Sequence, residues 1–455
     1  MRCIMKFTKV VVANRGDVAR RIIRALTTLK ISSVAVYSEA DASAPYLSEA
    51  DEAYCIGPAP ALSSYLNQDA ILKVIKKSGA DAVHPGYGFL SENWEFAKKV
   101  EENGVCFIGP SYNWIRDMGN KNLARNMVQK YGMPVAQGSD TLGTDMEEIL
   151  NEGRRIGFPV LIKPAGGGGG IGMLPAHNES ELKTMVERAR FLANRSFNND
   201  QLYMEKLFVK PRHIEFQVLA DRYGNVQHLF ERDCSIQRRH QKVIEESPSP
   251  NVREIDRLAE QIQSVLERMG YDNIGTVEML RGNDGSFHFL EMNTRLQVEH
   301  AVTEEITGID LVISQIKLAA GESLSDVLPE TIERNGHAIE ARVYAEDPVT
   351  FFPSPGRLTV FRPPVDSSIR IETGYQEGME VTPYYDPMIA KVIVHENTRN
   401  LAIKKLQQAL LQFDIQGIKT NIPFIIDMLK TEEFLSGNVH TGLSTELIAR
   451  GATLG

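Results

Sequence analysis

The stretch from Gly275 to His300 reads GTVEMLRGNDGSFHFLEMNTRLQVEH. An Asp-Gly pair between alternating hydrophobic residues predicts a β-hairpin whose two loop residues are Asp284 and Gly285. The residue pairs of that register are Asn283 with Ser286, Leu280 with Phe289, and Glu278 with Glu291. We therefore expect two carboxylates directly opposite each other on neighbouring strands.

Beyond the turn, every second residue carries a group suited to binding or catalysis: Glu291, Asn293, Arg295, Gln297 and Glu299. Because successive side chains of a strand point to opposite faces, we expect these five on one face of one extended segment. Opposed carboxylates with Cβ atoms about 5 Å apart repel each other unless a cation lies between them. Magnesium and manganese prefer oxygen ligands. The pattern therefore favours a metal and anion site over a pair of solvated acids.

Bulk composition limits the function classes. A chain of 455 residues suggests about three domains. Its net charge of -9 argues against general nucleic-acid binding, which needs a basic face. Four cysteines without C-x-x-C spacing predict neither a zinc site nor a disulfide framework, which fits the cytoplasm. No apolar run approaches the roughly 20 residues of a membrane span.

The first part of the chain alternates strands and helices. Apolar runs at 9–13, 33–37 and 81–85 predict strands, and 18–26 and 71–77 predict helices. This alternation is typical of a doubly wound parallel sheet. The first strand-to-helix turn holds Gly16 alone, without a dinucleotide fingerprint, so NAD is not expected there. A helix at 120–131 leads into a second domain, and an α+β pattern begins near Gly336.

Two segments suggest phosphate handling. A strand at 158–163 ends in Lys163 and runs through Pro164 into five glycines, Gly166 to Gly170. Glycines let backbone N–H groups approach a phosphate, and no Gly-Lys-Ser/Thr of a P-loop follows. We interpret the run as a phosphate-binding flap rather than a plain linker. The basic cluster at 231–242 alone is a solvated face, but beside a flap it suits phosphate or carboxylate ligands.

Five blocks of sequence carry a family resemblance: ANRGDVA at 13–19, HPGYGFLSEN at 84–93, ERDCSIQRRHQK at 231–242, EMNTRLQVEH at 291–300 and YYDPMIAK at 384–391. Together they resemble the biotin carboxylases, which are ATP-grasp enzymes. The resemblance implies ATP-dependent carboxylation of carrier-bound biotin with bicarbonate, through carboxyphosphate. It also implies an N-terminal doubly wound parallel-sheet domain at 6–118, an ATP-grasp domain at 119–330 with a glycine-rich lid near 135–206, and a C-terminal α+β domain at 331–448.

The site residues follow from the resemblance, position by position. It implies ATP contacts at Lys121, Lys163, Gly167, Gly168, Gly169, Gly170, Glu205, Lys206, Phe208, His213, Gln237, His240, Leu280, Glu278 and Glu291. Bicarbonate is implied at Lys242, Arg295, Gln297 and Val298, and biotin at Tyr87, Arg342 and Asp386. The implied catalytic residues are Glu299, Arg295, Arg342 and Lys242. Two magnesium or manganese ions are implied at Glu278, Glu291 and Asn293.

Partners are implied in the same way. The sequence contains no Met-Lys-Met of a biotin acceptor, so we expect biotin on a separate carrier protein. A carboxyltransferase subunit then decides which molecule finally receives the carboxyl group. Family members of this size are expected to form homodimers, and Arg21 stands at a position that resembles their dimer interface. We expect no nucleic acid or membrane among the partners.

The lid departs from the family pattern. Ile171 and Leu174 stand where the family has arginines, and Pro164 replaces a small residue. We therefore expect a raised KM for ATP. Two alternatives remain: a lid-impaired regulatory or scaffold homologue, and another ATP-grasp ligase that joins a carboxylate to an amine. The row from Arg295 to Glu299 and the motif around Arg342 favour the carboxylase.

Overall fold

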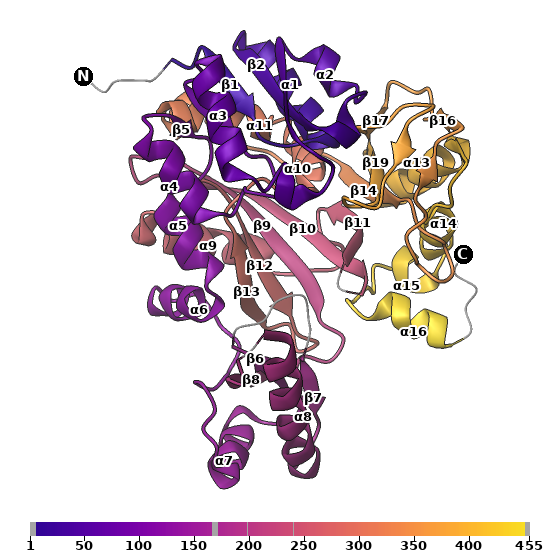
Figure 1. The fold of residues 1–455 in the computed structure, drawn as a ribbon. Coiled ribbons are helices and arrows are strands. Elements are labelled where there is room, and N and C mark those ends of the chain that lie inside the picture. Colours follow the sequence, from indigo (N-terminus) through magenta and orange to yellow (C-terminus); the bar gives the residue numbers. More distant parts are fainter. Residues whose placement is uncertain (1–5, 166–171, 198, 240, 451–455) are drawn as a thin grey trace. The chain divides into compact units, whose positions relative to one another are not determined.

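The structure is a computed structural model that describes residues 6–165, 172–197, 199–239 and 241–450 (Figure 1). Its contacts divide the chain into two compact units. Unit 1 comprises Met1–Met133, Arg212–Met279 and Glu291–Gly455, and unit 2 comprises Pro134–Pro211 and Leu280–Leu290. The boundaries of the three expected domains stay predictions.

The N-terminal sheet of unit 1 is parallel, as predicted. Its strand order is β3 (Glu52–Gly57), β2 (Ser32–Ser38), β1 (Lys9–Val12), β4 (Ala82–His84), β5 (Cys106–Phe107). Helices α1 (Gly16–Leu29), α2 (Tyr46–Glu49), α3 (Gln68–Ser78) and α4 (Trp94–Glu102) connect the strands. Val10 packs in one core with Ile22 of α1, whereas Val11 packs in another with Ile71 of α3. Successive side chains of the strand thus pack into two different cores, one on each face of the sheet, as a doubly wound sheet requires.

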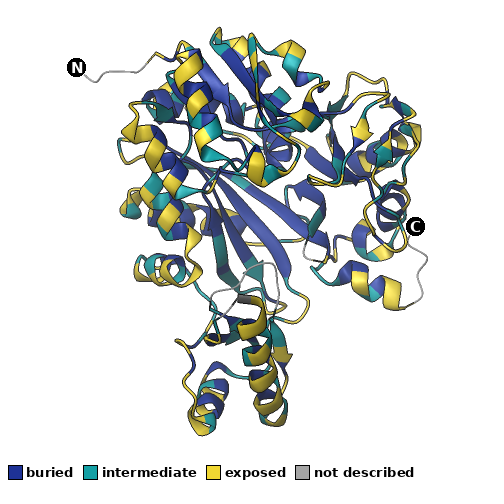
Figure 2. Ribbon diagram, in the orientation of Figure 1, coloured by how far each residue is buried: buried dark blue, intermediate teal, exposed yellow. Residues whose placement is uncertain are grey.

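A second, eight-stranded sheet begins in the middle of the chain. Its order is β13 (Phe287–Asn293), β12 (Asn273–Arg281), β9 (Arg212–Ala220), β10 (Val226–Arg238), β11 (Gln241–Ser247), β14 (His337–Tyr344), β19 (Met388–Glu396), β17 (Ile369–Glu372). Strand β14 pairs antiparallel with β11, so the predicted C-terminal α+β region continues the sheet of the middle region. Figure 2 draws much of β9, β10 and β14 as buried.

Helices cover this sheet and connect its strands. Those of unit 1 outside the N-terminal sheet are α5 (Tyr112–Gly119), α6 (Lys121–Lys130), α9 (Ile255–Met269), α10 (His300–Thr307), α11 (Leu311–Ala320), α12 (Leu324–Val327), α13 (Arg399–Gln412), α14 (Ile422–Met428), α15 (Glu432–Leu435) and α16 (Leu443–Ala449). Helix α6 confirms the helix predicted at 120–131, and Asn120 caps it by accepting from the Leu123 N–H.

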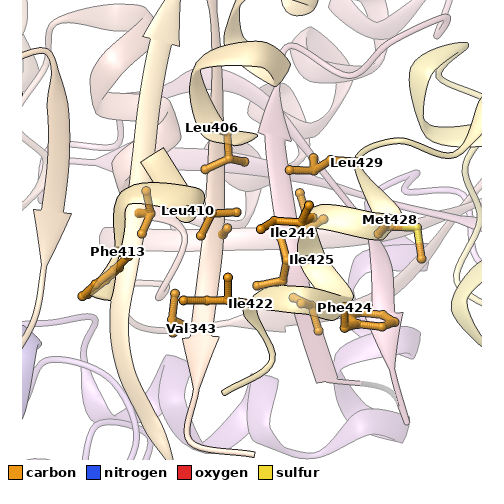
Figure 3. Packing of buried hydrophobic residues seen from close by; sticks show 14 of the residues in the cluster. Ile244, Val343, Leu406, Leu410, Phe413, Ile422, Phe424, Ile425, Met428 and Leu429 are labelled. Carbon is orange, nitrogen blue, oxygen red and sulfur yellow. The ribbon is translucent and has the colours of Figure 1, made fainter. Parts of the chain in front are cut away.

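The largest apolar cluster fixes the C-terminal strands in place. Figure 3 shows side chains of α13 and α14 gathered against Ile244 of β11 and Val343 of β14. Leu406, Ile425 and Val343 are each fully buried. Fully burying one such side chain contributes about 1.5–3 kcal/mol, so this core anchors the strand that carries Arg342.

Shorter strands complete the C-terminal region. Two of them are β15 (Gly356–Arg357) and β16 (Val360–Arg362). They pair with β18 (Glu380–Val381) and β20 (Asp414–Gln416). The pairing partners lie farther along the chain, so these strands depend on contacts that are not local in the sequence.

Unit 2 has its own sheet and core. Its strands are β6 (Val160–Pro164), β7 (Leu174–Ala176) and β8 (Leu202–Lys206), and its helices are α7 (Met146–Ile156) and α8 (Glu179–Phe197). Both pairings of β6 are antiparallel. Among the described residues of the chain, no helix is long and apolar enough to cross a bilayer.

Candidate active site

The polar row from Glu291 to Glu299 does not lie on one strand, which corrects the prediction. Strand β13 ends at Asn293, and Thr294 to Val298 form a bend and a turn before Glu299 at the start of α10. The side chains nevertheless converge. Arg295 Nη2 donates to Asn293 Oδ1 at 3.0 Å and its Nη1 to Gln297 Oε1 at 3.1 Å.

The hairpin turn also differs from the prediction. The Gly282 N–H donates to the Ser286 carbonyl at 2.8 Å, and the Gly285 N–H donates to the Gly282 carbonyl at 3.0 Å. The loop therefore has three residues, with Gly285 in the left-handed region at φ 84°. Beside the turn Ser286 therefore pairs with Gly282 instead of the predicted Asn283.

The pairing of Glu278 with Glu291, which lies farther from the turn, stays a prediction. The two carboxylates have different neighbours in unit 1. Glu291 Oε2 lies 2.9 Å from Lys121 Nζ. Glu278 Oε1 accepts from Asn293 Nδ2 at 2.9 Å and from Gln297 Nε2 at 3.4 Å.

Lys242 is the centre of a buried charge cluster. Its Nζ donates to Glu215 Oε2 at 2.6 Å, to Glu278 Oε1 at 2.8 Å and to Glu299 Oε1 at 2.6 Å. Burial disfavours the ammonium charge, but the three carboxylates outweigh that cost and raise the pKa of Lys242 well above its usual value. The lysine is therefore a fixed cation among carboxylates from two strands, β9 and β12, and from the start of α10.

Glu299 is fully buried and has two cationic partners. Oε1 accepts from Lys242, and Oε2 accepts from Arg342 Nη2 at 2.8 Å. Burial alone raises a carboxyl pKa, but Lys242 and Arg342 together hold the pKa of Glu299 well below its ordinary value. The group is therefore ionised at neutral pH, as a general base must be before it accepts a proton.

Glu278 is ionised for a similar reason. His213 Nε2 lies 3.0 Å from Glu278 Oε2, and Gln237 Nε2 lies 3.0 Å from His213 Nδ1. Although burial opposes it, the charges of Lys242 and His213 lower the pKa of Glu278. The row His213, Glu278 and Gln237 thus brings three predicted ATP or metal contacts together in unit 1.

Arg342 lies between this cluster and a cavity of about 480 Å³. The cavity wall includes the predicted residues Tyr87, Arg295, Val298, Arg342 and Asp386. All of them belong to unit 1. The cavity therefore brings together every residue predicted for biotin and two predicted for bicarbonate.

The remaining predicted residues lie in unit 2 or outside the described residues. Lys163 forms an ion pair with Glu205, and Lys206 Nζ donates to the Gly157 and Phe158 carbonyls at 2.9 and 2.8 Å. The Phe208 ring stacks on His288, with centroids 4.6 Å apart. Leu280 is the first residue of the second segment of unit 2. Gly167, Gly168, Gly169, Gly170, His240 and Ile171 lie outside the described residues.

Three residues that contact the predicted site residues were missed from the sequence. Glu215 joins Lys242 to Arg232, whose Nε lies 2.5 Å from Glu215 Oε1. Its signal was present, because polar residues alternate along β9 as they do after Glu291. Lys391, which is buried on β19, donates to the Val298 carbonyl at 2.8 Å, and Asp17 Oδ2 accepts from the Tyr87 hydroxyl at 2.7 Å.

Comparisons with known proteins agree along the whole chain. Three family models match successive ranges: "Biotin carboxylase, N-terminal domain" at 6–115, "Carbamoyl-phosphate synthase L chain, ATP binding domain" at 120–327 and "Biotin carboxylase C-terminal domain" at 340–446. Biotin carboxylase 2 of Bacillus subtilis is 50% identical over 438 residues, which cover 96% of this chain and 98% of the relative.

Solved structures give the same result. The biotin carboxylase domain dimer of Hydrogenobacter thermophilus 2-oxoglutarate carboxylase, in complex with MgADP, ADP and bicarbonate, has a TM-score of 0.90 at 43% identity and covers 98% of each chain. A biotin carboxylase complex with beta-gamma-ATP from Campylobacter jejuni has a TM-score of 0.91 at 42% identity, covering 97% of this chain and 99% of that one.

Proposed function

The chain belongs to the biotin carboxylase family, and from this premise we propose how its residues carry out the carboxylation of biotin with ATP and bicarbonate. The observation that carries the proposal is the position of Arg342, which contacts the buried Glu299 and also lines the cavity. The guanidinium of Arg342 therefore contacts the proposed base, Glu299, and also forms part of the wall of the proposed biotin pocket. Near-full-length similarity to biotin carboxylases decides against the scaffold and carboxylate–amine ligase alternatives.

We propose bicarbonate binding by Lys242, Arg295, Gln297 and the Val298 backbone. Lys242 and Arg295 supply positive charge, and the guanidinium fork of Arg295 suits a planar anion. Bicarbonate must compete for the cations that hold Glu299. When it draws Lys242 or Arg342 away, the pKa of Glu299 rises towards that of a more effective base.

The first chemical step then follows. Glu299 takes the proton of the bicarbonate hydroxyl, and the resulting oxyanion attacks the γ-phosphorus of ATP. The bond from phosphorus to the ADP oxygen breaks, and carboxyphosphate forms. Positioned cations stabilise the negative charge that spreads over the phosphoryl oxygens. Lys121 of unit 1 and Lys163 of unit 2 are proposed as ATP phosphate contacts.

The second step takes place at the cavity. Carboxyphosphate separates into carbon dioxide and phosphate, and phosphate accepts the N1′ proton of biotin. The biotin nitrogen then attacks carbon dioxide. We propose that Arg342 stabilises the enolate form of the biotin ureido group, and that Tyr87 and Asp386 contact biotin. Excluding water protects carboxyphosphate from hydrolysis, which is the role expected of a lid.

The donor atoms fit a divalent cation. Glu278 and Glu291 offer carboxylate oxygens and Asn293 an amide oxygen, which are the hard ligands that magnesium prefers. The lowered pKa of Glu278 keeps it anionic. Bound magnesium or manganese, with two ions expected, supplies charge neutralisation to the ATP phosphates.

Partners follow from the reaction. We propose that biotin arrives on a separate biotin carboxyl carrier protein and that a carboxyltransferase subunit takes the carboxyl group onward. We also propose a homodimer. In unit 1, Arg21 contacts Glu304 at 2.8 Å and Asp310 at 2.7 Å beside an open cavity that Arg370 also lines.

ATP cleavage tests the function directly. We expect the purified chain to cleave ATP only with bicarbonate, and free biotin to accelerate the reaction. Glu299→Gln should abolish both the bicarbonate-dependent ATP cleavage and its acceleration by biotin, because glutamine cannot accept the bicarbonate proton. Glu246→Gln, on the same strand as Lys242 but paired with His337 and Arg399, is the matched control and should retain both. Cleavage that ignores biotin would contradict the proposal.

A further inference from the structure

Two buried glutamates lie behind Arg342 in the eight-stranded sheet. Glu245 of β11 and Glu340 of β14 are directly opposite each other in the antiparallel register. Glu340 and Arg342 are two residues apart on β14, so their side chains leave the same face of the sheet. On the other side, Glu340 faces Ile393 and Arg342 faces Lys391 of β19.

Both carboxyl groups are deprived of water and of hydrogen bonds. Glu245 and Glu340 are each 0% exposed. Among the described residues, none of their four carboxylate oxygens has a hydrogen-bond donor. Arg342 Nη2 lies 2.5 Å from Glu245 Oε1, an ion-pair distance without hydrogen-bond geometry. Two ionised carboxylates cannot both persist in such a place, because like charges directly opposite in a dry sheet repel.

We propose that Glu245 and Glu340 share one proton at neutral pH and act as positioning residues that hold Arg342 at the cavity wall. The single negative charge of the pair balances the positive charge of the Arg342 guanidinium on the side away from the cavity. Its effect on catalysis rests on the function proposed for Arg342. The shared proton itself rests only on the strand register and on burial.

The surrounding charges set the direction of the pH response. Charged groups face the pair from each neighbouring element: Arg342 of β14, Lys242 of β11, Lys391 of β19, Arg370 of β17 and Glu299 before α10. Burial raises the pKa of both glutamates, and the charge of Glu299 adds to the rise in both. Arg342 opposes the rise in both, Lys242 opposes it in Glu245, and Lys391 and Arg370 oppose it in Glu340. Tyr87, Tyr344 and Cys234 also lie near, and burial keeps them neutral by raising their pKa values.

A rise in pH therefore removes the shared proton and adds a second negative charge behind Arg342. That charge draws the guanidinium away from biotin and offsets its positive potential. We expect the biotin-dependent rate to fall on the alkaline side. A raised folded-state pKa also means that the pair's contribution to stability is present at low pH and is lost as pH rises through the shifted pKa.

The Glu340→Gln variant isolates the shared proton. It keeps the side-chain shape, and its amide donates to Glu245, so one negative charge remains at every alkaline pH. We expect the alkaline apparent pKa of kcat for biotin carboxylation to rise by about one unit or more. ATP cleavage with bicarbonate but without biotin should change less, because Lys242 still pairs with Glu299. An unchanged biotin-dependent profile would overturn the proposal.

The Glu245→Gln variant tests the hold on Arg342. It removes one of the two carboxylates paired with the guanidinium and leaves Glu299, so we expect the KM for biotin to rise about fivefold with a smaller change in kcat. Glu246→Gln is the matched control, because Glu246 is the next residue on β11 and its partners are His337 and Arg399. If Glu245 had a merely structural role, Glu245→Gln and Glu246→Gln should change the KM for biotin to the same extent. That result would also overturn the proposal.

Infrared spectroscopy detects the proton without any turnover. At neutral pH we expect a protonated-carboxyl C=O band in the wild type that disappears in Glu340→Gln and in Glu245→Gln but persists in Glu246→Gln. A wild-type spectrum without that band would refute the shared proton. An enzyme that shows the band but no biotin-stimulated ATP cleavage would refute the proposed function alone.

Discussion

Replacing Lys242 by methionine provides the sharpest test of the buried charge cluster. The ammonium group lies within 2.8 Å of carboxylate oxygens of Glu215, Glu278 and Glu299. Each carboxylate keeps one other cationic or ionisable partner, respectively Arg232, His213 and Arg342. Because no carboxylate is left alone, we expect the loss typical of one broken buried pair, about 3–5 kcal/mol, rather than three such losses.

Thermal unfolding measures this loss. Unit 1 contains roughly 370 residues, so its unfolding entropy is about 0.8 kcal/mol per kelvin. A loss of about 3–5 kcal/mol therefore lowers Tm by about 4–6 °C at pH 7.5. Lys405→Met is the control, because Lys405 pairs with the partly exposed Glu396 at 2.7 Å. A pair of that kind is worth about 1 kcal/mol or less, or roughly 1 °C.

The pH dependence gives a second check on the same variant. In the wild type, Lys242 helps to hold the pKa of Glu278 and of Glu299 below the ordinary value. Their stabilising contribution is present above the unfolded pKa and is lost as pH falls through the folded pKa. Without Lys242 the pKa values of Glu278 and Glu299 rise. As pH falls, these carboxylates therefore become protonated in the folded variant, which removes the unbalanced negative charge that destabilises it. The Tm difference should shrink from pH 7.5 to pH 5. The reasoning would be refuted if Lys242→Met lowered Tm by less than about 1 °C at pH 7.5, or if the Tm difference from the wild type were the same at both pH values.

Four further variants address single contacts. Arg342→Lys loses the planar fork, so we expect biotin-stimulated ATP cleavage to fall about 100-fold, while cleavage with bicarbonate alone, measured in the same assay, changes far less. Glu278→Gln removes a ligand charge, and a magnesium titration at fixed ATP should show the half-maximal concentration rising about tenfold or more. Lys391→Met removes the donor to the Val298 carbonyl, so steady-state kinetics should show a KM for bicarbonate about fivefold higher. Ile171→Arg returns a cation to the lid and should lower the KM for ATP, and unchanged ATP kinetics would contradict that expectation.

The sequence predicted which polar side chains lie close together better than it predicted the backbone that carries them. Alternation of polar residues identified Asn293, Arg295 and Glu299, yet β13 ends at Asn293. An alternating pattern is equally compatible with a strand that gives way to a turn, because a turn also separates successive side chains. The convergence instead depends on hydrogen bonds such as that from Arg295 to Asn293. Those bonds involve side-chain conformations that strand periodicity does not encode.

The hairpin and the long sheet illustrate two other limits. The segment Asn283-Asp284-Gly285 suits either a two-residue loop or a three-residue loop that ends in a left-handed glycine. Sequence alone does not choose between them, and the choice moves the register by one residue. The pairing of β11 with β14 joins residues about a hundred positions apart, such as Glu245 and Glu340. Such long-range contacts depend on packing and leave no local pattern.

The buried carboxylates near Arg342 differ in protonation because they differ in cationic neighbours. Glu299 has two cations at hydrogen-bond distance, and its pKa is lowered. Glu340 is equally buried but has no hydrogen-bond donor among the described residues, and its pKa is raised. Burial alone raises the pKa of either group, so the direction of the shift depends on the contacts. The fold thereby favours the ionised form of the carboxyl group on one side of Arg342 and the protonated form on the other. Opposed shifts of this kind divide acid and base roles in an active site. In this enzyme they imply that moving Arg342 changes the protonation of both groups at once.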